Sequence, residues 1–210
     1  MSGVVRWEGT PPERKFQKMV GDPWCIGQNE GGGFLYDAVV TGAGGSLANC
    51  FVQVVDGLDA WEIPDGSGSV ELNQVDCLFV PKMVGVQLDQ VLMVRNSDGT
   101  MHNVHTKPDR NKEKNVSIPA GDTKAREFEF KRTEIIEVIC DVHAWMRGYI
   151  GVTDHPFFAI TDEAGAFSID GLPAGTYTLE AWHEKGGAKQ FEVTITAGGT
   201  ATAGPVMLGS

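Results

Sequence analysis

Three side chains with affinity for soft metals, Cys140, His143 and Met146, lie in one short stretch of the 210-residue chain. Strand-like residues precede this stretch at 134–139 and follow it at 149–153, so we expect one tight loop between two strands. Such a loop presents a thiolate, an imidazole and a thioether to one point. Together with a second imidazole, these groups form a type 1 copper site, in which two histidines and a thiolate lie in a plane with a weak axial methionine.

The second imidazole must come from another strand, and His102 is the candidate. It follows a predicted strand at 91–96 and the turn after it. His105 is close by, but side chains three apart on a strand point to opposite faces of the sheet. We therefore expect His102 to be a ligand and His105 to be a bystander, and the same holds for His155 and His183.

Alternation of apolar and polar residues predicts the elements that carry these side chains. It recurs along the chain, for example at 84–88, 127–131 and 191–196, and a period of two is typical of half-buried strands. The chain contains 27 glycines, many of them in turn-like clusters between the strands. We therefore predict an all-β protein of antiparallel sandwiches, with a short helix at 12–19.

The two metal-binding stretches resemble a known family. Residues 101–105 followed by 140–148 are similar to amicyanin and, more loosely, to plastocyanin and pseudoazurin, the small blue copper proteins of the cupredoxin family. Met101 stands where amicyanin has proline, and Trp145 stands where it has phenylalanine. The resemblance covers about residues 70–153 and implies a cupredoxin-like Greek-key β-sandwich.

The resemblance also implies a cofactor and roles for particular residues. It implies one copper ion per chain, cycling between Cu(I) and Cu(II), with four ligands: His102, Cys140, His143 and Met146. It implies that Asn103 braces the cysteine loop by hydrogen bonding from outside the ligand set. We further expect His143 to be a partly exposed exit for the electron and Trp145 to form part of the surface that contacts a partner.

The two ends of the chain carry different sequence motifs. Residues 160–167 and 172–179 resemble two strands of the carboxypeptidase regulatory-like, or prealbumin-like, sandwich, whose opening strands would lie at 3–9 and 47–55. We therefore predict a second small β-sandwich over 1–65 and 156–210, interrupted by a copper-binding domain at 66–155. The alternative is an intact module at 156–210 alone.

The expected chemistry is electron transfer without catalysis. The protein fills the coordination positions of a lone type 1 copper, so no position is open to a substrate. Ile139 and Asp141 flank Cys140, where copper nitrite reductases and multicopper oxidases have histidines leading to a second copper. We expect that the protein is not an enzyme. The alternatives to electron transfer are a copper carrier or resistance protein, and a structural or adhesive module with a vestigial metal site.

Charge and hydropathy limit the partners. Twenty-eight acidic against 17 basic residues give a net charge of −11, which disfavours nucleic acid and favours a basic redox partner such as a cytochrome, or another copper protein. No apolar stretch approaches the roughly 18 residues of a membrane span. Because blue copper proteins of this resemblance work in the periplasm or outside the cell, we expect that location, with any signal peptide removed.

Three cysteines remain outside the proposed ligand set, so at most one disulfide can form among them. Cys50 continues the apolar face at 48–54, as a buried thiol would. Cys25 and Cys77 lie in loop or strand-end contexts, and we favour a disulfide between them. The alternative is that all three thiols are free.

Overall fold

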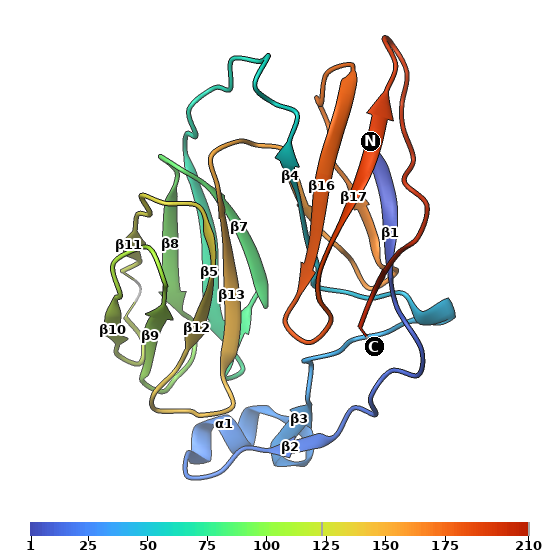
Figure 1. The fold of residues 1–210 in the computed structure, drawn as a ribbon. Helices are drawn as coiled ribbons and strands as arrows, with labels where there is room; N and C mark the ends of the chain where they lie inside the picture. Colours follow the sequence, from blue (N-terminus) through green and yellow to red (C-terminus); the bar gives the residue numbers. More distant parts are fainter. Residues whose placement is uncertain (123, 210) are drawn as a thin grey trace. The chain divides into compact units, whose positions relative to one another are not determined.

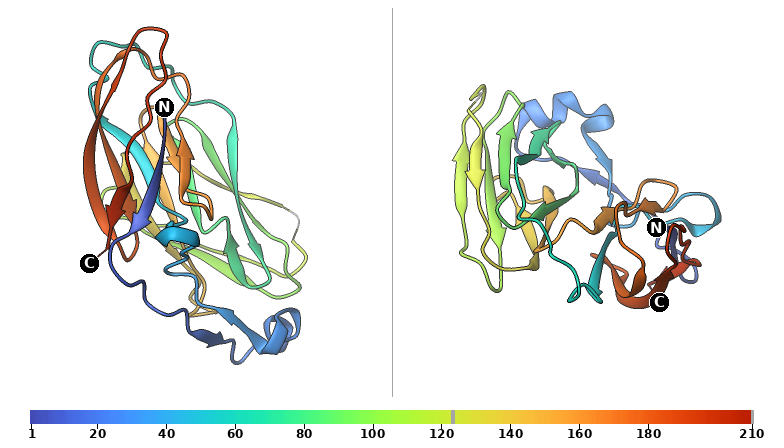
Figure 2. Two further views of the ribbon diagram at one scale, coloured as in Figure 1. Left: turned by 90° about the vertical axis from the view of Figure 1, so that its right-hand side faces the viewer. Right: turned by 90° about the horizontal axis from the view of Figure 1, so that it is seen from above.

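The computed structural model describes residues 1–122 and 124–209 (Figure 1). The prediction of an all-β chain is confirmed, since strands make up nearly all of its regular structure. The chain divides into two compact units, which Figure 2 shows from two further directions. Unit 1 comprises Met1–Arg14, Asp37–Pro64 and His155–Ser210, and unit 2 comprises Lys15–Tyr36 and Asp65–Asp154.

Unit 2 is a sandwich of two sheets. One sheet has the strand order β10-β9-β12-β13-β7 and the other has the order β11-β8-β5-β6. The strands are β5 (Ser69–Val75), β6 (Leu78–Val80), β7 (Met83–Gln87), β8 (Val91–Asn96), β9 (His102–Lys107), β10 (Asn115–Ile118), β11 (Arg126–Phe128), β12 (Glu134–Ile139) and β13 (Arg147–Thr153). Side chains from both sheets form one apolar core, so the sheets are packed face to face.

Alternation along each strand explains which side chains enter this core. On β8, Leu92 and Val94 are fully buried, and on β12 the same is true of Ile136 and Val138. Successive residues of a strand point to opposite faces. Cys140 continues the inward-facing positions of β12 and is itself buried, so the core face of this strand leads directly to the thiol.

Strand pairing brings the two metal-binding stretches to the same end of the sandwich. β9 and β12 are antiparallel, with Ile139 opposite His105. In this register, the residues that follow β12 lie beside the residues that begin β9. β12 and β13 form a hairpin in which Ile139 is opposite Arg147, so residues 140–146 form the connecting loop.

The segment Lys15–Tyr36, which we call the cover segment, lies at that end of unit 2 (Figure 1). It contains β2 (Phe16–Lys18), α1 (Pro23–Gln28), a 3-10 turn at Glu30–Gly32 and β3 (Gly33–Leu35), and β2 pairs with β3. Asp22 caps α1, its side chain accepting hydrogen bonds from the backbone amides of Trp24 and Cys25. Proline at the first helical position is pre-organised for this start.

The cover segment corrects two predictions. The helix expected at 12–19 is absent, and β2 occupies part of that range. The sequence also predicts that this segment belongs to the second sandwich, within residues 1–65, whereas it packs with unit 2. Two contacts explain this: a disulfide joins Cys25 to Cys77, and Met19 is buried in the core of unit 2.

Unit 1 is built from the remaining strands in two sheets, of order β15-β1-β18 and β14-β4-β16-β17. They are β1 (Ser2–Trp7), β4 (Phe51–Asp56), β14 (Phe158–Ile160), β15 (Ala166–Ser168), β16 (Gly175–His183), β17 (Gly187–Ile195) and β18 (Val206–Leu208), with a 3-10 turn at Ala43–Gly45. A second apolar core contains Cys50 as a free, buried thiol. Within the described residues, no helix has the length and apolar character needed to cross a membrane.

Loss of the disulfide should destabilise unit 2. The Cys25→Ser/Cys77→Ser double variant removes a cross-link between residues 52 positions apart, and a loop of this length constrains the unfolded chain by about 4 kcal/mol. We expect a correspondingly lower denaturant midpoint for the unit 2 transition. A dithiol reductant should lower the midpoint of the unaltered chain and leave that of the variant unchanged; equal midpoints without reductant would contradict the prediction.

Candidate metal centre

The start of β9 and the β12–β13 loop bring the predicted ligand side chains together. His102 is the first residue of β9, and Cys140 follows the last residue of β12. The loop is closed by two backbone hydrogen bonds, from Met146 N to His143 O (2.9 Å) and from Cys140 N to Met146 O (3.3 Å). Four residues thus have fixed backbone positions at one end of the core.

Three of the four predicted donors form a compact group. The Nδ1 atoms of His102 and His143 are 2.8 Å apart, and Cys140 Sγ is 3.8 Å from Nδ1 of His143. One ligand atom from each residue lies within 4.8 Å of the others. The exposed fractions of His102, Cys140 and His143 are 0%, 2% and 2%. Met146 is 1% exposed and belongs to the same core as Cys140.

The distal nitrogens of both imidazoles face carboxylates. His102 Nε2 is 2.7 Å from Asp98 Oδ2, and His143 Nε2 is 3.2 Å from Asp22 Oδ2. When both Nε2–H groups donate to these carboxylates, both Nδ1 atoms carry lone pairs. Two buried lone pairs at 2.8 Å repel each other, and either a proton on one Nδ1 atom or a cation bound to both removes the repulsion. The donor set therefore fits a metal ion.

The ligand atoms indicate which type of metal the site would suit. Two imidazoles and a thiolate, with a methionine beside them in sequence, are typical of a type 1 copper centre. His102, Cys140 and His143 would hold the ion, and Met146 is the candidate fourth ligand. Copper, when bound, supplies a one-electron couple.

The environment of Cys140 favours the thiolate that a metal requires. Burial raises the pKa of the thiol, but hydrogen bonding with His102 and with backbone amides, including that of Asn103, has the larger combined effect and lowers the pKa of Cys140 below its usual value. A lower pKa increases the fraction of thiolate, which is the form that binds metal.

The pKa values of the two imidazoles are shifted in opposite directions. Burial lowers the pKa of His102, but the hydrogen bond with Asp98 and the interaction with Cys140 outweigh burial, so the pKa of His102 is raised. For His143, burial lowers the pKa and the nearby His102 lowers it further, so the pKa of His143 remains lowered despite its hydrogen bond with Asp22. His143 is therefore the more readily neutral ligand.

Asn103 occupies the position expected of a residue that braces the cysteine loop. Its Oδ1 accepts a hydrogen bond from Asp141 N (2.7 Å) and is 3.2 Å from Cys140 Sγ. Its Nδ2 donates to Asp141 Oδ2 (3.0 Å) and to Asn115 Oδ1 (2.7 Å). These contacts fix the start of the loop to β9 and β10.

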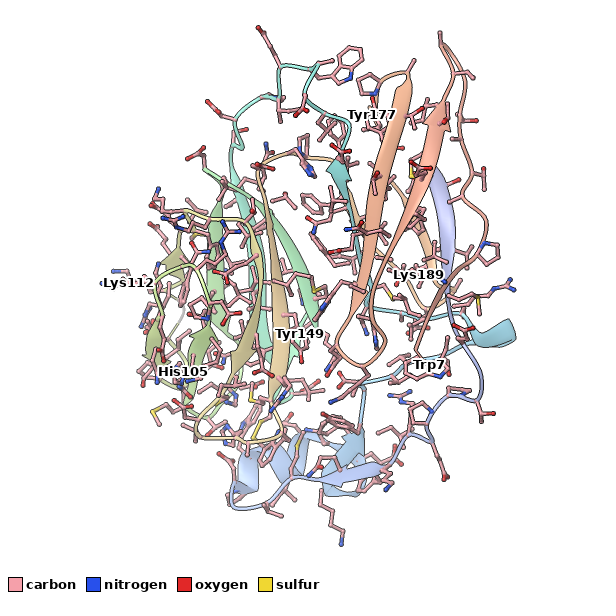
Figure 3. All side chains as sticks on the ribbon, in the orientation of Figure 1. Trp7, His105, Lys112, Tyr149, Tyr177 and Lys189 are labelled. Carbon is pink, nitrogen blue, oxygen red and sulfur yellow. A yellow bond between two sulfur atoms is a disulfide. The ribbon has the colours of Figure 1, made fainter. Side chains whose placement is uncertain are left out.

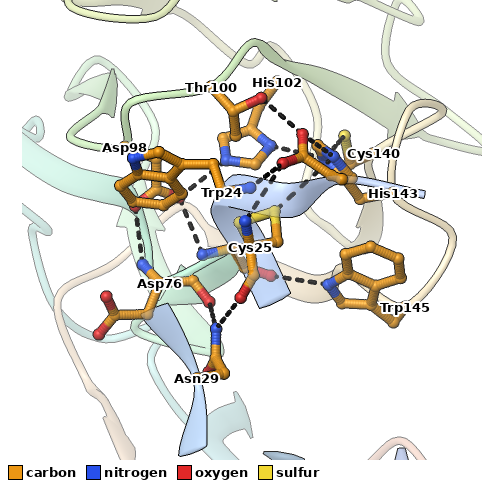
Figure 4. The surroundings of a disulfide bond; sticks show 12 residues. Trp24, Cys25, Asn29, Asp76, Asp98, Thr100, His102, Cys140, His143 and Trp145 are labelled. Atoms are coloured by element: carbon orange, nitrogen blue, oxygen red, sulfur yellow. Dashed lines mark hydrogen bonds and ion pairs between the residues drawn. A yellow bond between two sulfur atoms is a disulfide. The ribbon is translucent and has the colours of Figure 1, made fainter. Parts of the chain in front are cut away.

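His143 differs from the expectation of a partly exposed electron exit. Its side chain is 3% exposed, because the cover segment lies over its distal edge, with Asp22 at 3.2 Å and Cys25 Sγ at 3.8 Å from Nε2 (Figure 4). Sequence patterns do not predict the place of Asp22, because no periodicity relates it to His143. A local signal existed, since Asp22-Pro23 is a typical helix start.

Trp145 lies next to His143 on the side facing the surface. The two ring centroids are 5.0 Å apart, and Trp145 Nε1 donates to Cys77 O at 3.0 Å. Trp145 is half-buried and lines a surface hollow. The cover segment bounds the hollow on one side, and the β12–β13 loop with the first residue of β13 bounds it on the other. The lining residues besides Trp145 are Gln17, Lys18, Val20, Tyr36, Val142, Ala144 and Arg147.

Two further groups of potential ligands share the same histidines. Asp22 and Cys25 lie near His143, and Cys77 and Asp98 lie near His102. Both cysteines are joined in the disulfide, so neither provides a thiolate. The group around Cys140 is the one of these three that contains a free thiol.

The remaining histidines have other partners. His105 lies at the outside of the sandwich (Figure 3), where its ring contacts Asp141 and Glu113. In unit 1, His155 Nε2 is 2.8 Å from Val54 O, and His183 Nδ1 accepts hydrogen bonds from two backbone amides. Each ring thus has a structural role where it lies.

Comparisons with known proteins give limited matches. Residues 130–203 match a family described as polysaccharide lyase family 4, domain II, and no curated protein matches the sequence. The chain is similar to a purple cupredoxin from Nitrosopumilus maritimus (16% identity, 40% of this chain, 98% of that chain, TM-score 0.34). It is similar to a reduced Cu(I) form of an amicyanin variant (20% identity, 43% of this chain, 86% of that chain, TM-score 0.35). It is also similar to a copper-containing nitrite reductase from Thermus scotoductus SA-01 (21% identity, 48% of this chain, 25% of that chain, TM-score 0.34).

Replacing the two neighbouring histidines one at a time tests the ligand set. His102→Gln should remove the intense visible absorption of the copper-loaded protein, because one of the two candidate ligand nitrogens is lost. His105→Gln should retain it, because His105 lies on the other face of β9. Absorption spectra at equal copper loading measure both effects, and loss of the band in His105→Gln alone would contradict the assignment.

Proposed function

We propose that this protein is a mononuclear type 1 copper protein that passes single electrons between redox partners. The observation that supports this most is the buried convergence of His102, Cys140 and His143, with the two Nδ1 atoms 2.8 Å apart. It brings together the donors that a type 1 centre requires, at one end of a rigid sandwich.

Rigidity of the ligands is what this function demands of the chain. The pairing of β9 with β12 fixes His102 and Cys140 relative to each other, and the hydrogen bonds of Asn103 fix the start of the loop. A ligand set held in this way changes little between Cu(I) and Cu(II), so little reorganisation opposes the transfer. Burial excludes water from the same positions.

The electron exit that we propose is Trp145. The edge of His143 is covered by Asp22 and the disulfide, whereas the indole of Trp145 lies 5.0 Å from the imidazole and borders the surface hollow. The ring provides a short route from the ligand shell to the hollow. Its position also agrees with its proposed place on the partner-binding surface.

The proposed partner is another redox protein, such as a basic cytochrome or a second copper protein. Most of the acidic surplus is in unit 1, which has four basic and 12 acidic residues, against 13 and 16 in unit 2. The negative field would steer a basic partner and repel nucleic acid, and its effect should weaken with salt.

We propose a periplasmic or extracellular location. The Cys25–Cys77 disulfide lies beside the metal centre, and disulfides persist in oxidising compartments. We also propose no enzymatic role, because the candidate ligands leave no position for a substrate.

A copper carrier or resistance protein is the second candidate. The same donors would bind copper for delivery, but the burial of all four residues and the cover segment over His143 favour retention. Fast redox cycling with little copper loss to a chelator would support electron transfer, and ready loss would support carriage. If the isolated protein contained no metal, the third hypothesis, a structural or adhesive module, would be supported.

Cysteine replacement tests the copper assignment directly. Cys140→Ser should abolish the strong thiolate-to-copper absorption, because an alcohol oxygen does not form that covalent bond. The matched control is Cys50→Ser, which changes the other free cysteine, in unit 1, and should retain the band. Absorption and electron paramagnetic resonance spectra measure the outcome, and colour that survives in Cys140→Ser would refute the assignment.

The exit route is tested by Trp145→Leu. We expect slower electron self-exchange with a nearly unchanged absorption spectrum, because the ring is removed from the route while the ligands remain. Trp61→Leu is the control, since Trp61 is an exposed tryptophan of unit 1. Nuclear magnetic resonance line broadening gives the self-exchange rate of each variant. Equal rates in Trp145→Leu and Trp61→Leu would rule out this route.

A further inference from the structure

Each candidate ligand imidazole has its own carboxylate on the distal nitrogen. Asp98 lies in the turn before β9 and faces His102 at 2.7 Å. Asp22 lies in the cover segment and faces His143 at 3.2 Å. The two carboxylates come from distant parts of the sequence and hold the two rings in the same way.

Asp98 is fixed in place by backbone amides. Its Oδ1 accepts a hydrogen bond from Asp76 N (2.8 Å), and its Oδ2 accepts one from Cys77 N (2.9 Å) as well as contacting His102. The residue is 3% exposed. A carboxylate with so many partners cannot turn away from the imidazole without breaking several hydrogen bonds.

The two oxygens of Asp22 perform different tasks. Oδ1 caps α1 by accepting hydrogen bonds from Trp24 N (2.8 Å) and Cys25 N (3.2 Å). Oδ2 contacts the metal-binding region, accepting from Thr100 Oγ1 (2.6 Å) and facing His143 Nε2 (3.2 Å). The carboxylate therefore connects the cover segment to the turn before β9 and to the β12–β13 loop.

The disulfide connects the two carboxylates to each other. The backbone amide of Cys25 donates to Asp22, and the backbone amide of Cys77 donates to Asp98. Because Cys25 and Cys77 are covalently joined, the disulfide links the backbone amides that hold the two carboxylates.

We propose that Asp22 and Asp98 are positioning residues that direct Nδ1 of both histidines to the copper and stabilise Cu(II) relative to Cu(I). This proposal rests on the proposed copper function. A carboxylate that accepts the distal N–H fixes the tautomer and makes the imidazole a stronger donor. Its negative charge also favours the more highly charged ion, and the effect is stronger in a buried site than in water.

Asp22→Asn separates the two tasks of Asp22. The Asn carbonyl oxygen can still cap α1, which leaves the amide nitrogen in the place of Oδ2. That nitrogen donates hydrogen bonds and cannot accept one from His143. We expect Cu(II) affinity to fall by about 10- to 100-fold, with a smaller change for Cu(I). The reduction potential should rise by 59 mV for each tenfold change in the ratio of the two affinities.

Two other variants complete the experiment. Asp22→Ser retains a helix-capping oxygen and removes the carboxylate, so it should raise the potential in the same direction and serves if Asp22→Asn folds poorly. Thr100→Val removes the other hydrogen bond to Oδ2 and keeps the carboxylate beside His143. It should leave the potential close to that of the unaltered protein.

Affinities for both copper ions, the reduction potential and the absorption spectrum give distinct outcomes. A raised potential with the thiolate band retained supports the proposal, as does selective loss of Cu(II) binding. An unchanged potential with an intact band overturns it and leaves the copper function standing. Equal loss of Cu(I) and Cu(II) affinity in a folded variant also overturns it. Absence of the band from the unaltered, copper-loaded protein means that the proposed function itself is wrong.

Discussion

The close approach of the two buried imidazoles constrains the whole metal-binding region. The Nδ1 atoms of His102 and His143 lie 2.8 Å apart, and the distal nitrogens already have carboxylate partners. Two buried nitrogens this close need a shared proton or a metal cation, because two bare lone pairs would repel each other. The surrounding strands, loop and cover segment must be stable enough to hold the rings in this arrangement.

The sandwich of unit 2 supplies that stability through ordinary strand pairing. β9 and β12 are hydrogen-bonded neighbours, and the inward-facing side chains of β12 are continuous with the apolar core. Cys140 stands where this core ends, and the next residues leave the sheet. The donor atoms are therefore at the boundary between a close-packed interior and the polar network of Asn103 and the two carboxylates.

Much of this arrangement could be predicted from the sequence. Strand alternation showed the β class, and Cys140, His143 and Met146 lie close together in sequence, so a single loop brings their backbones together. His102 required only one long-range inference. The cover segment could not be predicted in this way, because Asp22 and His143 are 121 positions apart and no strand pairing relates them. The polar residues at 13–18 suit a helix by local propensity, but pairing with β3 makes part of that range a strand.

The order of the segments along the chain has a consequence for biosynthesis. Unit 2 ends at Asp154, whereas unit 1 needs β14–β18, which follow it. As the chain emerges N-terminus first in the compartment where it folds, every residue of the metal-binding sandwich is available while unit 1 still lacks most of its strands. Since domains generally fold as units when their residues become available, unit 2 can fold before unit 1. The two early fragments of unit 1, with β1 and β4, depend on the last part of the chain to bury their apolar faces.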